Sequence, residues 1–202
     1  LNGNSIVNLI VTKGVLDAMV ENSGTIIANG GEVYLTTNAV NELLKGVVNN
    51  TGIIEANSLD DVTGKVEVYA HGGTANVSGS INAEGGFVET SGKDLKVTEQ
   101  TKIKAKTWLI DPYDIEIVSD SVTETAITPS SGTYTAPSDS TKIKASTLVT
   151  ALNAGTDVTV TTSGGGTQNG DITVNSDITW TTNKSLTLNA DRNIYINSNI
   201  TA

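Results

Sequence analysis

The feature that most constrains this chain is an internal repeat. The phrase Asn-Ser-Gly-Thr-Ile-Ile-Ala-Asn at 22–29 recurs as Asn-Thr-Gly-Ile-Ile-Glu-Ala-Asn at 50–57, and a weaker copy lies at 78–83. The glycines of the three copies are spaced 28 and 27 residues apart. Self-similarity at a period of a few tens of residues is typical of repeat architectures. The chain is therefore predicted to fold as a series of similar units.

The repeating unit is predicted to consist of short strands. Apolar and polar residues alternate within it, as in Lys-Val-Glu-Val-Tyr at 65–69, and Gly, Asn, Asp and Ser separate the alternating runs. The C-terminal part repeats with a shorter step, because 171–179 matches 193–201 at an offset of 22. We expect an all-β chain in which each unit is too small to bury its apolar face alone and stacks on the next.

Strands that repeat without intervening helices favour a parallel β-helix, or solenoid. A β-sandwich also uses many short strands and is the alternative. Hairpins would favour the sandwich, but few two-residue turns separate strands of matched length, and Asn29-Gly30-Gly31 is one candidate. The β-helix is therefore the preferred fold. Trp108 continues the alternation of 103–105 and is expected to pack in the core or at the boundary between turns.

Two segments depart from the strand pattern and predict short helices. They lie at 38–46 and 146–155, where apolar residues have helical spacing. Asn38 and Ser146 favour the N-cap position, and Gly155 is a residue that commonly ends a helix. Both helices are expected to bridge or decorate the stack of strands.

A loop is predicted to interrupt the repeats. Half of the residues from 119 to 141 are Ser or Thr, and two prolines lie among them. Such a stretch forms a loop or an extruded hairpin, and long loops often carry function. The chain is thus divided into β-helix turns over 1–118, the Ser/Thr/Pro-rich loop over 119–141, and further β-helix turns over 142–202.

Composition excludes several classes of function. The chain has 12 Lys and Arg against 22 Asp and Glu, a net charge of −10, one His and no Cys. Nucleic-acid binding needs a basic face, so the charge argues against it. Without Cys there are no disulfides, thiolate metal sites or Cys nucleophiles. No signal peptide follows Leu1, so an internal fragment of a longer chain is expected.

Candidate catalytic and metal-binding groups have simpler interpretations. His71 lies at a turn with no nucleophile at a fixed spacing, and Gly164-Gly165-Gly166 lacks the Lys-Ser/Thr of a phosphate loop. Paired carboxylates could hydrolyse a polysaccharide, and acidic turns could hold calcium. The acidic residues considered for these two roles are Asp60, Asp61, Asp111, Asp114 and Glu116, and Asp171, Asp177 and Asp191. Turn or surface roles are favoured, so no catalytic, cofactor-binding or metal-binding residue is predicted.

Five longer phrases resemble those of a known family, and they lie at 30–56, 86–92, 108–112, 153–160 and 191–194. Through them the chain is similar to exoproteins of bacterial two-partner secretion with a filamentous-haemagglutinin-type domain, and most similar to the high-molecular-weight adhesins of Haemophilus-like bacteria. The related haem-acquisition exoproteins are also similar.

The resemblance implies a right-handed parallel β-helix that is exported through an outer-membrane transporter barrel. It also implies a non-enzymatic role at the bacterial cell surface, in attachment to a host receptor or glycan. Alternatives are a module that binds a haem-carrier protein through the loop at 119–141, or a structural shaft or secretion scaffold. The Asn-Pro-Asn motifs of the family's secretion signal are absent from the sequence, which is expected to begin downstream of them.

Two further expectations concern the surface. Some adhesins of this family are glycosylated on Asn-x-Ser/Thr, which makes four residues candidate glycosylation sites: Asn49, Asn76, Asn183 and Asn199. A stack of strands also has an open sheet edge at each end, which invites end-to-end self-association. No cofactor is expected.

Overall fold

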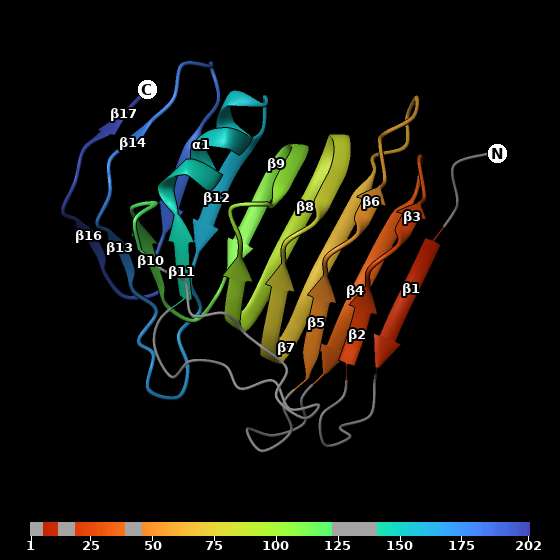
Figure 1. Cartoon of the computed structure of the whole chain (residues 1–202), viewed down its shortest axis with the longest axis horizontal. Helices are drawn as coiled ribbons and strands as arrows, with labels where there is room; N and C mark the ends of the chain where they lie inside the picture. The colour runs from red at the N-terminus through yellow and green to blue at the C-terminus, as the bar shows by residue number, and fades with distance from the viewer. Residues whose placement is uncertain (1–5, 12–18, 39–45, 123–140) are drawn as a thin grey trace.

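The computed structural model describes residues 6–11, 19–38, 46–122 and 141–202. Strands dominate these residues, and every pairing between named strands is parallel (Figure 1). The all-β prediction is therefore confirmed. Most of the helix predicted at 38–46 and most of the loop predicted at 119–141 lie outside the described residues.

Eleven strands form the largest sheet. One row of it runs β1-β4-β7-β8-β9-β12-β15, and β2, β3, β5 and β6 pair beside this row. The strands of this sheet are β1 (Ile6–Val11), β2 (Met19–Asn22), β3 (Thr25–Ile27), β4 (Glu32–Asn38), β5 (Val47–Asn50), β6 (Ile53–Glu55), β7 (Lys65–Val77), β8 (Ser80–Val97), β9 (Lys102–Asp111), β12 (Asp157–Thr161) and β15 (Leu186–Asn189).

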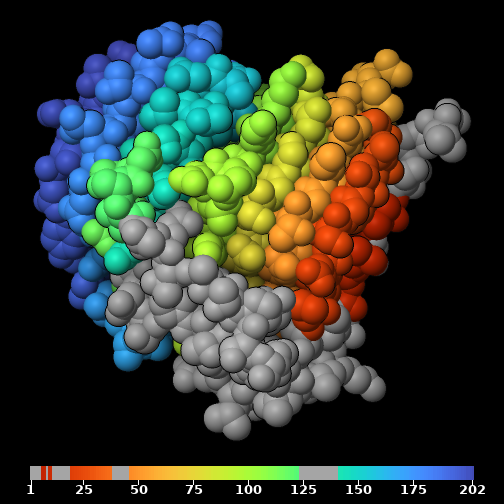
Figure 2. All heavy atoms as spheres, viewed as in Figure 1, coloured from red at the N-terminus to blue at the C-terminus, as the bar shows by residue number. Residues whose placement is uncertain are grey.

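Two smaller sheets complete the structure. The first has the order β11-β10-β13-β16 and the second is β14-β17. Figure 2 shows the strands from β4 to β9 as adjacent diagonal bands across one face, and β1 and β17 lie on opposite sides of the molecule in Figure 1. The strands of the two smaller sheets are β10 (Ile115–Val118), β11 (Thr141–Lys144), β13 (Ile172–Val174), β14 (Ile178–Thr179), β16 (Ile194–Ile196) and β17 (Ile200–Thr201).

The register places like side chains in columns. Val33, Val66, Val88, Trp108 and Val158 are successive partners across β4, β7, β8, β9 and β12, and all five are fully buried. Because the side chains of a strand alternate between its two faces, the residues next to these five in each strand point outward. Inward Ile, Val and Leu form one continuous core, and the inward position predicted for Trp108 is confirmed.

The repeat glycines lie where neighbouring backbones approach closely. A Cβ atom on Gly52 would overlap the carbonyl oxygen of Gly24, and one on Gly79 would overlap that of Gly52. Neither Gly52 nor Gly79 has a positive φ. Space, rather than backbone conformation, therefore requires glycine at these two positions.

The helix predicted at 146–155 is present as α1 (Ala145–Asn153). Ser146 was expected to be its N-cap, but Lys144 holds that position without a side-chain bond, and Ser146 lies in the first turn, where its hydroxyl donates to Asp120. The predicted end is correct. Gly155 has φ +93°, its N–H bonds the Leu152 carbonyl, and the next N–H bonds the Ala151 carbonyl.

The chain steps backward before α1. Strand β11 pairs with β10 on the side away from β13, although it follows β10 in sequence. Helix α1 then packs against β9, β11, β12 and β14, and buries Leu148 and Leu152. No helix in the described part of the chain is long and apolar enough to cross a membrane.

Candidate binding site

The four candidate glycosylation residues lie in two kinds of environment. Asn49 is buried, its amide nitrogen donates to Glu21, and its amide oxygen accepts from Asn76 at 2.9 Å. The Asn49 and Asn76 nitrogens are thus engaged in a ladder between neighbouring strands. Asn183 and Asn199 are exposed, so among the four they are the most accessible to a transferase.

Two of the acidic candidates, Asp114 and Asp171, bond neighbouring segments of the chain. Asp114 accepts from the backbone N–H groups of Gly170 at 2.6 Å and Asp171 at 2.7 Å. Asp171 forms a bidentate pair with Arg192, and that guanidinium lowers the pKa of the Asp171 carboxyl. Among the described residues no three His, Asp or Glu side chains converge as a metal-binding group.

Five further acidic candidates and His71 are near the surface, whereas Asp111 is partly buried. Asp60 has φ +48° and lies with Asp61 in a tight turn between the bridged residues Leu59 and Val62. Glu116 accepts a hydrogen bond from the Asn175 amide, and Asp177 accepts one from a backbone N–H. Asp191 is exposed. His71 is exposed at the irregularity in β7, and its ring stacks on Tyr69 with 3.6 Å between centroids.

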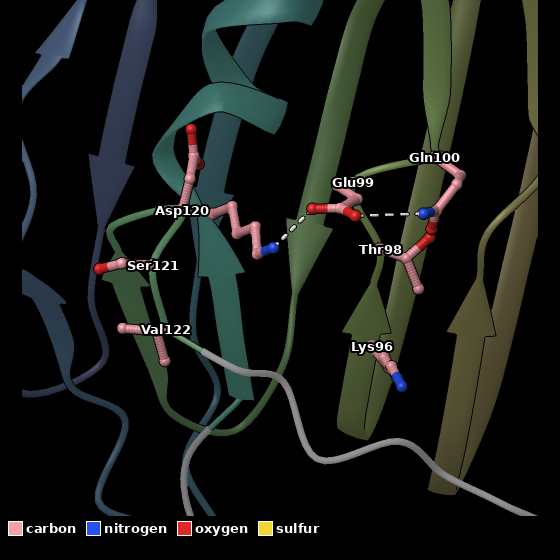
Figure 3. Close-up of a pocket in the computed structure, with 8 residues that line it drawn as sticks. Lys96, Thr98, Glu99, Gln100, Asp120, Ser121 and Val122 are labelled. Carbon is pink, nitrogen blue, oxygen red and sulfur yellow. Dashed lines mark hydrogen bonds and ion pairs between the residues drawn. The ribbon is translucent and has the colours of Figure 1, made fainter.

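A polar cleft lies where β11 steps backward (Figure 3). Its volume is about 350 Å³, and Thr98, Glu99 and Gln100 face Asp120 and Lys144 across it. Lys144 is only 8% exposed, and its ammonium bonds Glu99 at 2.6 Å, which lowers the pKa of that carboxyl. The cleft's most buried cation is therefore already satisfied within the chain.

The outward side of β4, β7, β8 and β9 carries aromatic and acidic residues. We call it the aromatic–acidic face and define it by Tyr34, Glu67, Tyr69, Glu89 and Asp111. Tyr34, Glu67 and Glu89 are successive register partners, and Tyr69 and Asp111 are both partners of Ser91. These five side chains thus form two adjacent columns on one lateral surface.

In the first column an ammonium group from the chain itself neutralises one carboxylate, that of Glu67. Lys65 pairs with Glu67, and its Nζ lies 5.3 Å from the centroid of the Tyr34 ring. The hydrogen bond to Glu67 raises the pKa of Lys65. The Tyr34 hydroxyl donates to Glu32 at 2.5 Å, and this bond raises the pKa of Tyr34. The column combines a cation–π contact with an ion pair.

No described cation pairs with Glu89, which ends the first column, or with Asp111 in the second column. Burial raises the pKa of Asp111, and the negative charge of Glu89 raises it further. Burial likewise raises the pKa of Tyr69, with Asp111 and Glu89 adding to the effect. One oxygen of Asp111, Oδ1, is buried without a hydrogen-bond partner, while Glu89 accepts from Ser91 at 2.8 Å. Negative charge is thus concentrated and uncompensated here.

Sequence reasoning found only one of the three residues Tyr69, Glu89 and Asp111. Asp111 was a candidate for paired-carboxylate chemistry, whereas Tyr69 and Glu89 were noted only as parts of strands. Tyr69, Ser91 and Asp111 are register partners 22 and 20 residues apart, whereas the repeat glycines are 28 and 27 residues apart. Aligning the repeats would therefore not have placed these side chains in one column.

Comparison with known proteins finds no matching family model and no matching curated protein.

Proposed function

We propose that this chain is a non-catalytic segment of a large secreted bacterial adhesin, folded as a right-handed parallel β-helix. The fold proposal is supported by the parallel register between strands about one repeat apart, as in Val33 with Val66 and Ile172 with Ile194. The repeat phrases that resemble two-partner secretion exoproteins support the class of protein. An outer-membrane transporter barrel would export the chain to the cell surface.

The observation that carries the attachment function is the aromatic–acidic face. Its residues come from four neighbouring strands, so attachment does not depend on one loop. Half-buried Tyr side chains beside charged groups are typical of recognition surfaces, since each ring offers a large contact area at a small entropic cost. A host receptor or glycan is the proposed partner of the lateral surface.

End-to-end self-association is part of the proposal. At the β16 end Ile196 is 51% exposed, whereas its register partner Val174 is fully buried. Ile194 and Ile200 are uncovered in the same way, while their partners Ile172 and Ile178 are buried. Unpaired strand edges next to uncovered apolar side chains favour addition of further strands.

The proposed function predicts saturable binding of the purified chain to epithelial cells. The measurement compares labelled chain with an unrelated β-helix of similar size and acidity, because net charge alone alters non-specific adsorption. Saturation above that control supports attachment through these repeats. Binding equal to the control contradicts it and favours a structural shaft.

A further inference from the structure

We propose that Asn169 is a site of spontaneous deamidation, at which the Asp114 carboxylate acts as the general base. Asn169 precedes Gly170 in the connection between β12 and β13. Glycine after asparagine hinders attack on the side-chain amide least, because glycine has no Cβ atom. The inference goes beyond the proposed attachment function and does not depend on it.

The first argument is the position of the base. The backbone nitrogen of Gly170 donates to Asp114 Oδ1 at 2.6 Å. A general base must lie within about 2.6–3.2 Å of the atom whose proton it removes, and the Asp114 carboxylate meets this condition. The backbone N–H groups of Asn169 and Asp171 donate to the same carboxylate at 3.3 and 2.7 Å. These bonds hold the carboxylate against the peptide unit that would react.

The second argument is that the Asn169 side chain is available to react. It is exposed, and its amide group forms no hydrogen bond within the part of the chain that the structure describes. Gly170 has φ +82°, and a Cβ atom there would overlap the Asp191 side chain. The fold itself therefore requires the glycine that makes Asn169 reactive.

The third argument is the contrast with Asn29, in the other Asn-Gly pair of the described residues. Gly30 also has a positive φ, +69°. The Asn29 side-chain oxygen, however, accepts from the Asn57 backbone N–H at 2.9 Å, and the Gly30 nitrogen donates to the Asn57 carbonyl at 2.7 Å. A neutral carbonyl oxygen is a far weaker base than a carboxylate, and the Asn29 side chain must leave Asn57 before it can react. Asn29 is therefore expected to react much more slowly.

The reaction consumes water and releases ammonia. Asp114 takes the proton from the Gly170 nitrogen, and this nitrogen attacks the carbonyl carbon of the Asn169 side chain. The carbon–nitrogen bond of the side-chain amide then breaks, and ammonia leaves with the transferred proton, so that Asp114 returns to its ionised form. Water opens the resulting cyclic imide at either carbonyl, which leaves aspartate or isoaspartate at position 169.

Deamidation is expected to weaken the connection between β12 and β13. Asp114 anchors this connection through three backbone N–H groups, and Asp191 lies against Gly170. A carboxylate at position 169 would stand beside groups of the same charge, and isoaspartate would also lengthen the backbone by a methylene group. The converted chain should unfold at a lower denaturant concentration than the fresh chain. An equal midpoint would contradict this effect on the turn.

The test follows the full chain in neutral buffer at physiological temperature by peptide mapping with mass spectrometry. Conversion at Asn169 should be at least about tenfold faster than at Asn29, since a positioned general base contributes a factor of this size or more. Asp114→Asn keeps an oxygen acceptor but removes the base, so it should slow conversion by about tenfold or more. Asp177→Asn is the matched control, because Asp177 also accepts from a backbone N–H, that of Asn199 at 2.8 Å. It should leave the rate within about twofold.

Three results would overturn the proposal: no conversion at Asn169, equal rates at Asn169 and Asn29, or an unchanged or faster rate in Asp114→Asn. A faster rate would mean that Asp114 protects the turn instead of acting as its base. Equal slowing in Asp177→Asn would also overturn it, since net charge would then explain the effect.

A comparison with unfolded chain keeps the proposal testable if Asp114→Asn does not fold. Circular dichroism first establishes whether the variant is folded. Wild-type chain is then incubated in buffer and in concentrated urea, where Asp114 no longer lies beside Gly170. The proposal requires conversion at Asn169 to be faster in the folded chain than in the unfolded one. An equal or slower rate in the folded chain would contradict it.

Discussion

Trp108→Ala should destabilise the chain by about 3–5 kcal/mol, the range for removing a fully buried large aromatic side chain. Trp108 is 0% exposed, and it lies between Val88 and Val158 in the inward column. Its indole N–H donates to the Thr90 hydroxyl at 3.0 Å, so the substitution also leaves a buried hydroxyl with one bond fewer. Chemical denaturation followed by circular dichroism measures the change in the free energy of unfolding.

Phe87→Ala is the matched control for the tryptophan. Phe87 immediately precedes Val88 in β8 but points outward, where it is half-buried beside Lys65. Its removal should cost under about 1 kcal/mol, because outward substitutions away from special contacts have small effects. Equal losses for the two variants would mean that the inward and outward assignments of β8 and β9 are wrong.

Gly52→Ala is expected to have the second large effect, a loss of about 3 kcal/mol or more. The new methyl group would overlap the carbonyl oxygen of Gly24, which belongs to a backbone that cannot move without breaking the pairing of β3 with β6. Overpacking costs about 1–3 kcal/mol even where side chains can adjust. Thermal or chemical unfolding of the variant measures the loss.

Gly24→Ala is the control within the same repeat. Nothing lies within 4 Å of a Cβ atom at Gly24, and its φ is not positive. Alanine there should leave stability within about 1 kcal/mol of wild type, or raise it slightly by restricting the unfolded chain. If Gly24→Ala and Gly52→Ala are equally harmful, the repeat glycines do not lie in the close stack described above.

The parts of the fold that depend on the repeat could be predicted from the sequence. The glycines at 24, 52 and 79 mark the repeat, and alternation around Trp108 indicates which side chains face the core. The end of α1 was also predictable, because Gly155 is the type of residue that adopts a positive φ at a helix terminus. The alternation and the helix end are local signals that require only a few neighbouring residues, and the repeat can be read directly by comparing the sequence with itself.

The parts that depend on distant contacts could not be predicted. Ser146 has the chemistry of an N-cap, but the helix begins at the buried Ala145, so its N-cap lies two residues earlier, at Lys144, and Ser146 bonds Asp120 instead. The polar cleft was missed because Glu99 and Lys144 meet only through the backward step of β11. Tyr69, Glu89 and Asp111 were not grouped, because outward columns can be assigned only once the register between strands is known.

The parallel register is the claim on which both the fold and the aromatic–acidic face depend. The chain has no cysteine, so an engineered pair gives a direct test. Thr159 and Thr187 are outward register partners on β12 and β15. Directly opposed residues on neighbouring strands lie about 4.8 Å apart, within the range that a disulfide spans.

The measurement is the rate and yield of disulfide formation in the monomeric chain under mild oxidation. Thr159→Cys with Thr187→Cys should oxidise readily, whereas Thr159→Cys with Asn189→Cys is two positions out of register, at about 8 Å, and should not. This difference is the result that the account predicts. Failure of the first pair, or equal oxidation of both, would contradict the parallel register.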